Sequence, residues 1–375
     1  MTSARPDPPW RTLLLVGGGH AHVAVLADWI RRGAPPRART MLLTPEPCLR
    51  YSGMVPGWLA GQHAQGEGLV DLAALAQRAG VEWVPGRCVA LDPVARNVTT
   101  DSGRIIRFDY ASLDTGGQGR GRALLGEDPR LIEVRPIAAF VERIAALPAP
   151  ARVVVVGGGA GGVELAFGLR NLAGTGQRPA VRLVTGAAGL LPGFAACARA
   201  RALRALARQG IAVVAANARF ERGALMAGQA SLEPADLVIA ATGSAAPAWV
   251  RASGVATDAD GFLSIDARHS SLSHPHILAA GDIAARADRT LAHAGVHAVR
   301  AGPVLAANLR ALLGGKAPQA TYRPRRQSLC LINAGDGSAI LSYGPLCAEG
   351  RWVLALKHAI DKAWVAQYAR LAATA

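Results

Sequence analysis

The chain carries two copies of one short pattern, in which an apolar run leads into a glycine-rich turn and then a helix. The first copy reads TLLLVGGGHAHVAVL at residues 12–26, and the second reads RVVVVGGGAGGVELAFGL at residues 152–169. A strand, a glycine turn and a helix in this order form the unit that places a dinucleotide pyrophosphate at a helix N-terminus. Two copies predict a parallel α/β fold with two separate nucleotide sites.

The three glycines of such a turn have different roles. The first permits the tight turn, the second lets the backbone approach a pyrophosphate, and the third lets the helix pack closely on the strand. The second copy has all three, at Gly157, Gly159 and Gly162. The first copy keeps Gly17 and Gly19 but has His22 in the third position.

A histidine in the third position reduces the closeness of packing rather than the contact with phosphate, because that position faces the strand. His20 lies inside the turn and so nearer to any phosphate. Two interpretations stay open for both histidines. They are packing and helix-start residues, or one of them donates a hydrogen bond to a phosphate or its neighbouring water.

The second strand of each unit is expected to end without the acid that binds ribose hydroxyls. These strands are expected at 40–44 and 181–185; the first ends at Thr44, two residues before Glu46, and the second ends at Thr185. A threonine hydroxyl can bond a ribose, but more weakly than a carboxylate. The sequence therefore does not distinguish NADH from NADPH.

Further elements follow from the apolar runs. Buried strands are expected at 81–91, 211–215, 236–241 and 276–282, and a helix is expected at 295–313. A segment rich in proline and arginine at 317–327 marks a boundary. A strand pair and a helix are expected after it.

Composition limits the classes of function. With 51% hydrophobic and 18% charged residues, the chain is typical of a soluble globular protein. No apolar run reaches the roughly 18 residues of a membrane-spanning helix, and residues 1–11 are a poor signal peptide, so a cytoplasmic protein is expected. The net charge of +15 comes mostly from arginine, and reflects either a GC-rich genome or attraction to anions. Nucleic acid is not expected, because the arginines are scattered.

Five cysteines are present, at positions 48, 88, 197, 330 and 347. None is spaced from another as C-x-x-C or C-x-x-x-x-C, so neither a zinc site nor a local dithiol pair is expected. Five free thiols in a reducing compartment are the expectation.

The motifs together resemble the FAD-dependent pyridine nucleotide-disulfide oxidoreductase superfamily, over nearly the whole chain. The residues that carry the resemblance are GGGHAHV at 17–23, YSGMVPGWLAG at 51–61, SLDTGG at 112–117, ATG at 241–243 and AAGD at 279–282. Within the superfamily, the chain is similar to the type II NADH dehydrogenase-like group, and most to the subgroup found beside or fused to selenophosphate synthetase. A histidine in the third glycine position is usual there.

The resemblance implies FAD in the first unit and NAD(P)H in the second. It divides the chain into an FAD-binding domain at 1–120 and 248–316, an NAD(P)H-binding domain at 121–247, and a small α+β segment at 317–375. It implies these FAD contacts: Gly17, Gly19, His20, His22, Thr44, Glu46, Gly53, Pro56, Val89, Thr115, Gly116, Gly281, Asp282, Ala294 and Gly295. Among them, Asp282 is expected to bond the ribityl chain, and the helix that starts at Gly295 is expected to face the flavin ring.

For NAD(P)H, the resemblance implies contacts from Gly157, Gly159, Gly162, Thr185, Thr242 and Gly243. Glu164 is expected near the nicotinamide. The chain departs from its relatives at Ala292-His293, where they carry Pro-Lys. His293 would restore that positive charge near the flavin only when protonated.

The implied reaction is hydride transfer from NAD(P)H to FAD, followed by electron transfer to an acceptor, with a quinone favoured. It requires no side-chain nucleophile. Disulfide reductases need C-x-x-x-x-C after the first unit, where this chain has Gly53 five positions after Cys48. Sulfide oxidation is disfavoured because no cysteine pair is expected near the flavin.

The helix over 352–367 offers a way to reach such an acceptor. On a helical wheel, one face carries Trp352, Val353, Leu356, Ile360, Ala363 and Trp364, and the other carries Lys357, His358, Asp361 and Lys362. This pattern suits a helix at a membrane interface, so peripheral contact through 350–368 at the inner face of the membrane is one interpretation. An ordinary helix that faces the core or a second copy in a homodimer is the other.

Two other functions stay open. One is a soluble NAD(P)H-flavin reductase in selenium or sulfur metabolism, which would not bind membranes. The other is a flavin-bound sensor or interaction protein with little turnover, which the missing ribose acids and His293 would favour.

Overall fold

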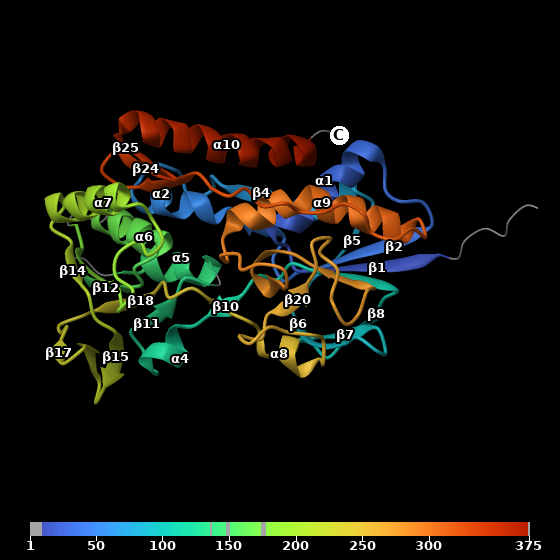
Figure 1. Ribbon diagram of the computed structural model, residues 1–375, viewed down its shortest axis with the longest axis horizontal. Helices are drawn as coiled ribbons and strands as arrows, with labels where there is room; N and C mark the ends of the chain where they lie inside the picture. Colours follow the sequence, from blue (N-terminus) through green and yellow to red (C-terminus); the bar gives the residue numbers. More distant parts are fainter. Residues whose placement is uncertain (1–9, 136, 148–150, 174–177, 374–375) are drawn as a thin grey trace, which may run out of the picture.

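The computed structural model describes residues 10–135, 137–147, 151–173 and 178–373. Two parallel sheets, each with its own helices, lie side by side, and the C-terminal segment covers one side of both (Figure 1). We call the part built on the first sheet the first unit and the part built on the other sheet the second unit. This is the mixed α/β fold predicted from the two glycine turns.

The first sheet has the order β21-β9-β1-β2-β5, and all its pairs are parallel. Its strands are β1 (Arg11–Val16), β2 (Ala38–Leu43), β5 (Glu82–Val84), β9 (Tyr110–Leu113) and β21 (Ile277–Ala279). The helices α1 (His20–Arg32) and α9 (Gly295–Leu313) pack together on one face of it. The bounds of α9 agree with the helix predicted at 295–313.

The strand predicted at 81–91 is wrong, because two strands of different sheets occupy this range. Pro85 lacks an N–H donor and Gly86 has a φ of +143°, so the chain turns after β5. The second strand, β6 (Cys88–Asp92), pairs with β7 (Asn97–Thr100), which pairs with β8 (Ile105–Arg107) in an antiparallel sheet.

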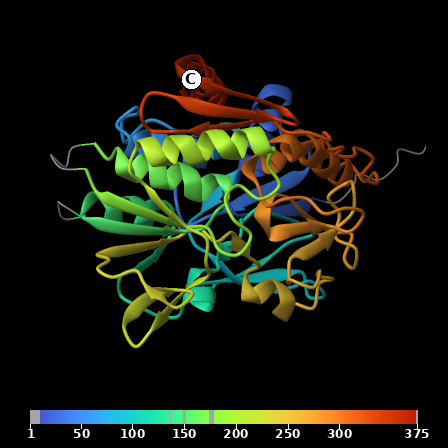
Figure 2. The ribbon, with the colours of Figure 1, turned by 60° about the vertical axis from the view of Figure 1, so that its left-hand side comes forward.

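The second sheet has the order β11-β18-β12-β13-β14 and is also parallel throughout. Its strands are β11 (Leu131–Glu133), β12 (Arg152–Val156), β13 (Ala180–Val184), β14 (Ala212–Val214) and β18 (Leu237–Ala240). The helices of this unit are α5 (Ile137–Ala145), α6 (Ala160–Arg170) and α7 (Ala196–Arg208). Figure 2 shows α6 and α7 lying over the strands of this sheet.

The C-terminal segment contains three strands where two were predicted. β23 (Cys330–Asn333), β24 (Ala339–Tyr343) and β25 (Leu346–Gly350) form an antiparallel sheet, and α10 (Arg351–Ala373) follows at once. In Figure 1, α10 runs along the top of the molecule across both units. Within the described residues, no helix is long and apolar enough to cross a membrane.

Shorter elements connect these parts. They are β3 (Cys48–Arg50), η1 (Ser52–Met54), α2 (Val55–Leu59), β4 (Leu69–Asp71), α3 (Leu72–Arg78), β10 (Gln118–Gly119), α4 (Gly121–Leu125), β15 (Ala218–Glu221), β16 (Ala224–Ala227), β17 (Ala230–Ser231), β19 (Ser244–Ala245), α8 (Ala248–Ala252), β20 (Leu263–Ile265), η2 (Gly281–Ile283) and β22 (Ala284–Arg286).

The helix that follows each glycine turn packs against that turn in a different way in the two units. In the second unit, a Cβ on Gly162 would overlap the carbonyl oxygen of Gly157, so α6 packs directly against its own turn. In the first unit, the His22 ring fills the equivalent space. Its Nδ1 lies 2.6 Å from the Gly17 carbonyl oxygen and its Nε2 lies 2.8 Å from the hydroxyl of Ser112. Both ring nitrogens are thus bonded within the protein, which favours the packing interpretation of His22.

The expectation of five free thiols is wrong for two of them. Cys197 on α7 and Cys347 on β25 form a disulfide with a Cα–Cα distance of 6.3 Å. Their 150-residue separation gives no local spacing signal, so only the folded arrangement reveals the pair. Cys48, Cys88 and Cys330 are free.

The contact between α6 and its turn predicts opposite effects of two neighbouring substitutions. We expect Gly162→Ala to destabilise the protein by about 1–3 kcal/mol, because the new methyl group forces α6 off the turn. Gly161→Ala is the matched control: its Cβ meets no atom within 4 Å, so helix propensity makes it neutral or stabilising by up to about 1 kcal/mol. Urea denaturation of both variants measures the difference. Equal losses of stability would contradict the packing argument.

Candidate functional site

A buried carboxyl group, that of Asp114, shapes the first glycine turn. Its oxygens accept hydrogen bonds from the backbone N–H groups of Ala21 (2.8 Å) and His22 (3.1 Å) at the start of α1. A Cβ on Gly19 would overlap this carboxyl group, so glycine is required there. Burial raises the pKa of Asp114 to about 7 in spite of these two bonds, and the charge of Asp282 also raises it. A partly protonated group at this place repels a pyrophosphate less than a full charge would.

The structure brings many of the residues predicted to bind FAD to one end of the first sheet. The turn at 17–20, the end of β9, η2 and the start of α9 all lie around Asp114 and Gly281. Thr44 is buried beside the turn, whereas Glu46 is exposed. Val89 lies in the separate sheet of β6, 48% exposed.

Asp282 joins the first unit to the second. Its Oδ2 forms an ion pair with Arg135 at 2.9 Å and accepts a hydrogen bond from the hydroxyl of Ser244 at 3.2 Å. Both partners belong to the second unit or its connection. The predicted bond from Asp282 to a ribityl chain stays a prediction, and it would compete with this pairing.

His293, just before α9, is exposed and stacks on Phe262 with ring centroids 4.1 Å apart. Ala294 is the residue that caps α9, so Ala294 and Gly295 carry the free N–H groups of its first turn. The predicted roles of these residues beside the flavin remain predictions.

Two buried polar atoms near the two turns have no partner among the described residues. They are Nε2 of His20 in the first unit and the hydroxyl of Thr242 in the second. Burial lowers the pKa of His20 to about 4, so its ring is neutral at pH 7 and can accept or donate one bond. Buried polar atoms without partners are costly, and polar atoms of a bound dinucleotide would satisfy them. The two sites therefore fit two dinucleotides.

In the second unit, Gly157 has a φ of +144°, and a Cβ on it would overlap the carbonyl oxygen of Ala241. Gly159 precedes α6 in extended conformation, and no atom lies within 4 Å of where its Cβ would be. The Thr185 hydroxyl donates to its neighbouring carbonyl at Gly186 (3.3 Å). Gly243, with a φ of +88°, follows Thr242 at the same end of the sheet.

Three charged side chains meet where the two units contact α10. We call them the buried charge cluster: Glu164, Lys357 and Asp361. The ammonium group of Lys357 lies 3.1 Å from Oδ2 of Asp361 and 3.7 Å from Oε1 of Glu164. It also donates a hydrogen bond to the carbonyl of Gly53 at 3.1 Å. The backbone N–H of Asn333 donates to Oε1 of Glu164 at 2.8 Å. The cluster thereby ties α6, η1, β23 and α10 together.

Burial and charge act in opposite directions on the pKa values of the cluster. Burial raises the pKa of Glu164 and of Asp361 above their ordinary values, although Lys357 opposes this. Burial alone would lower the pKa of Lys357, but the two carboxylates raise it, so the ammonium form persists. One cation between two acids leaves an excess negative charge. This excess charge and the burial both act against the ionised form of the two carboxyl groups.

An aromatic group lies between the cluster and the first turn. The rings of Tyr51 and Trp364 stack with centroids 4.5 Å apart, and His20 lies 5.1 Å from Trp364 and 5.6 Å from Tyr51. Burial raises the pKa of the Tyr51 phenol to about 12, and the charge of Asp361 contributes. α10 therefore packs beside the first glycine turn. Gly53, predicted to pass near the flavin, lies against Tyr51 and accepts a bond from Lys357, whereas Pro56, predicted there too, lies against Gly168 of α6.

The predicted orientation of the C-terminal helix is partly wrong. Lys357 and Asp361, expected on the outer face, are buried, because they pair with each other and with Glu164 on α6. Val353 and Trp364 are buried as well. The rest of the expected apolar face points outward: Trp352, Leu356, Ile360 and Ala363 are exposed. A lysine and an aspartate four residues apart predict an ion pair along the helix but do not tell whether that pair is buried.

Comparison with known proteins gives one family. The family described as Pyridine nucleotide-disulphide oxidoreductase matches residues 11–302. Among curated proteins, the biphenyl dioxygenase system ferredoxin–NAD(+) reductase component of Paraburkholderia xenovorans is 33% identical over 60% of this chain and 56% of its own length. The sulfide-quinone reductase of Aquifex aeolicus is 27% identical over 28% of this chain and 24% of its own. The chain thus spans about half or less of these relatives.

Solved structures share the fold. The sulfide:quinone oxidoreductase of Aquifex aeolicus matches with a TM-score of 0.75 and 17% identity, over 96% of this chain and 92% of its own. The water-forming NADH oxidase of Lactobacillus brevis matches with a TM-score of 0.72 and 20% identity, over 89% and 75%. The fold and the superfamily expected from the sequence are confirmed.

The buried charge cluster predicts a large effect of removing its cation. We expect Lys357→Met to destabilise the protein by about 3–5 kcal/mol, because two buried carboxylates lose their partner. Lys362→Met, five residues along α10, removes only an exposed ion pair with Glu67 at 3.7 Å and is expected to cost less than about 1 kcal/mol. Thermal unfolding of both variants compares them. A loss at Lys357 no larger than at Lys362 would show that the cluster is not buried in solution.

The raised pKa of Asp114 predicts a pH dependence of stability. The folded state disfavours the charged form, so this contribution is full below about pH 4 and is lost as the pH rises through about 7. Asp114→Asn should remove a decline of up to about 1.4 kcal/mol per pH unit between about pH 4 and 7, above which both states are ionised and the slope vanishes. Chemical denaturation of both proteins between about pH 4 and 8 measures it. Parallel curves for the two proteins would mean that Asp114 titrates normally.

Proposed function

Because the chain belongs to the pyridine nucleotide-disulphide oxidoreductase family, we propose that it transfers a hydride from NAD(P)H to FAD and passes the electrons to a quinone. The observation that carries the proposal is the position of the buried charge cluster. It lies where the first unit, the second unit and α10 meet, next to Gly53. Two buried carboxyl groups therefore lie where the two units meet, and we propose that they exchange protons during the reaction.

The residues around each site have separate tasks in this proposal. Gly17, Gly19 and His20 would hold the FAD pyrophosphate, and Gly157, Gly159 and Thr242 would hold NAD(P)H. The first turn of α9, at Ala294 and Gly295, presents N–H groups and the positive end of its dipole toward developing negative charge. Bound FAD supplies a ring that accepts a hydride and releases electrons. The stacked rings of Tyr51 and Trp364 would exclude water from the adjoining side of the site.

The reduction of a quinone needs two protons as well as two electrons, whereas a ferredoxin takes up electrons alone. Carboxyl groups that can supply protons therefore favour a quinone as the acceptor. In this proposal Glu164 and Asp361, whose pKa is raised by burial, would supply protons, and Lys357 fixes the position of both carboxylates. The exposed apolar face of α10 would allow peripheral contact through 350–368 with the membrane in which a quinone dissolves.

Two competing chemistries have weaker support. Cys330 lies close enough to Glu164 and Lys357 for their charges to act on it, but burial raises the pKa of its thiol to about 12. It is therefore a protonated, unreactive thiol at neutral pH. The ferredoxin–NAD(+) reductase relative makes a small iron–sulfur protein the second candidate acceptor.

Anaerobic stopped-flow mixing tests the first half of the proposal. We expect the flavin absorbance of the FAD-loaded protein to bleach with NADH or NADPH, and the faster of the two identifies the nicotinamide. Reoxidation is then followed with a soluble quinone, and separately with a ferredoxin. A protein that stays oxidised with both nucleotides would contradict the proposed activity, and reoxidation by ferredoxin alone would replace the quinone.

The role of Glu164 can be separated from that of the fold. We expect Glu164→Gln to slow reoxidation by a quinone about 10–100-fold, because a proton donor is lost, while reoxidation by ferricyanide, which takes no proton, is unchanged. Glu142→Gln, an exposed glutamate on α5, is the control and should change neither rate. Equal slowing with both acceptors would assign Glu164 a structural role instead.

A further inference from the structure

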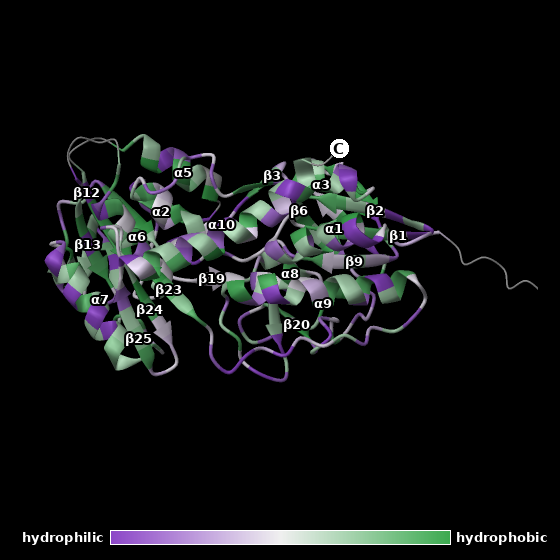
Figure 3. Cartoon of the chain, turned by 90° about the horizontal axis from the view of Figure 1, so that it is seen from above, coloured by the Kyte–Doolittle hydropathy of each residue, from purple (hydrophilic) through white to green (hydrophobic). Residues whose placement is uncertain are grey.

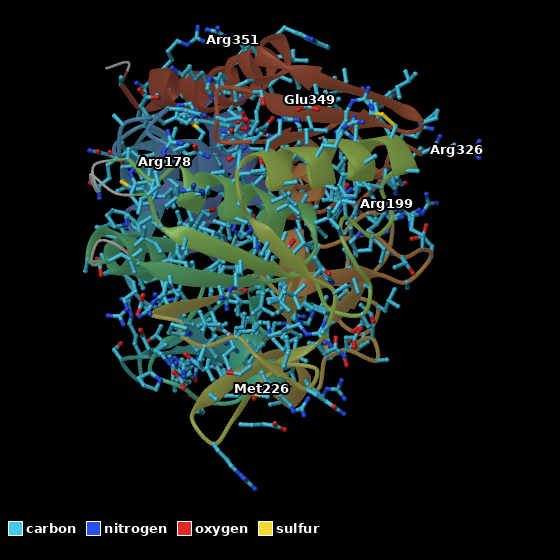
Figure 4. All side chains as sticks on the ribbon, turned by 90° about the vertical axis from the view of Figure 1, so that its left-hand side faces the viewer. Arg178, Arg199, Met226, Arg326, Glu349 and Arg351 are labelled. Carbon is cyan, nitrogen blue, oxygen red and sulfur yellow. A yellow bond between two sulfur atoms is a disulfide. The ribbon has the colours of Figure 1, made fainter. Side chains whose placement is uncertain are left out.

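An open pocket of about 570 Å³ lies between α7, β25 and the start of α10, away from both nucleotide turns. Four arginines line it together with two acids: Arg201, Arg204, Arg208, Arg351, Asp336 and Glu349. We call it the basic pocket. Figure 4 shows Arg351 and Glu349 above α7 at the outer edge of the molecule.

Two of the arginines are already committed to partners within the protein. Arg208 pairs with Glu349 at 2.6 Å. Arg201 donates toward the sulfur of Cys347 at 3.2 Å and toward the carbonyl of Cys197 at 3.4 Å, so it is held against the disulfide. The disulfide joins α7 to β25 and thereby fixes the two walls of the pocket relative to each other.

The other two arginines remain available. Arg204 and Arg351 are exposed and have no ion pair in the described part of the chain. The remaining acid, Asp336, accepts hydrogen bonds from the backbone N–H and hydroxyl of Ser338. With four arginines and two acids, the pocket holds two positive charges in excess. Guanidinium groups suit the oxygens of a phosphate, which they can bind in pairs.

An apolar surface adjoins the basic pocket. A second hollow, of about 790 Å³, shares Arg351 and Asp336 with it and is lined by Trp352 and Ala355 of α10. From there, three large apolar side chains follow one line along the helix, at four-residue spacing. They are Trp352, Leu356 and Ile360, which are 58%, 36% and 44% exposed. Figure 3 looks down on the outer side of α10, which crosses the middle of the molecule.

We propose that the basic pocket binds the phosphate headgroup of an anionic lipid while Trp352, Leu356 and Ile360 enter the boundary between headgroups and acyl chains. The inference rests on the peripheral membrane contact of the proposed function and adds a headgroup site to it. Cations at headgroup level beside an apolar helical line are what such a surface requires. An acidic protein would match the arginines but would leave the apolar line without a role.

General electrostatic attraction must be separated from a site, because a chain of net charge +15 is drawn to any anionic surface. The test therefore compares two variants with the same change of charge. Arg204→Glu with Arg351→Glu alters the basic pocket. Arg104→Glu with Arg107→Glu alters two exposed arginines in and beside β8, on the side of the molecule opposite to α10 (Figure 1).

The measurement is flotation of the FAD-loaded protein with phosphatidylcholine vesicles, with and without about one quarter phosphatidylglycerol. We expect the unaltered protein to bind the anionic vesicles about 10-fold more tightly than the neutral ones. The basic-pocket variant should lose most of this preference, and the β8 variant should lose less than about 3-fold. Trp352→Ser with Leu356→Ser should weaken binding to both vesicles. Unchanged FAD content and thermal midpoint show that each variant is folded.

Several outcomes would overturn the proposal. Equal losses in the two charge variants would mean diffuse attraction without a site. Full competition by glycerol 3-phosphate, with normal binding of the Trp352→Ser, Leu356→Ser variant, would mean a site for a free phosphate compound. Binding of an acidic ferredoxin but of no vesicle would make the surface a protein interface.

The lipid site and the quinone acceptor can fail separately. If vesicles bind as expected but quinone reduction in detergent fails, the acceptor proposal fails and the lipid site stands.

Discussion

The ammonium group of Lys357 joins three parts of the chain that lie far apart in sequence. It contacts Gly53 of the first unit, Glu164 of the second and Asp361 of its own helix. Without this cation the two buried carboxylates would keep no opposite charge in exchange for their lost hydration, so the ion pairs favour assembly of the three parts around it. α10 is therefore a component of the junction between the units rather than an appendage to them.

The orientation of α10 follows from this pairing and in turn decides what the surface offers. Lys357 and Asp361 face inward together with Val353 and Trp364, and Trp352, Leu356 and Ile360 lie on the exposed side of the same helix. Arg351, at the start of α10, lines the same pocket as Arg204 and Arg208 of α7. The buried ion pair and the exposed apolar line are thus two sides of one helix.

Much of the fold was open to prediction, because local patterns determine it. The glycine turns, the parallel strands after them and the helix at 295–313 each depend on neighbouring residues. The break at Pro85-Gly86 could also have been anticipated from turn chemistry. The buried side of α10 could not, since hydrophobic periodicity assigns charges to solvent and only the approach of Glu164 from another element reverses that. The pairing of Cys197 with Cys347 had no sequence signal at all.

His22 illustrates the limit of interpreting a motif by its consensus. Its ring fills the space between α1 and the turn. Two hydrogen bonds of the ring, to Gly17 and Ser112, replace the direct packing of helix on turn that Gly162 allows in the second unit. The substitution is compatible with the turn because the fold supplies a hydroxyl on β9 at the right distance.

The disulfide between Cys197 and Cys347 has a topological consequence. It closes a covalent ring that contains part of the second unit, all of α9 and most of the C-terminal sheet. A protease that cuts one exposed loop inside this ring opens it but releases no fragment, so α10 stays tethered to the body of the protein. Only a cut outside the ring, after β25, can set the helix free. Once the disulfide is reduced, a cut inside the ring would instead divide the chain into two separate fragments.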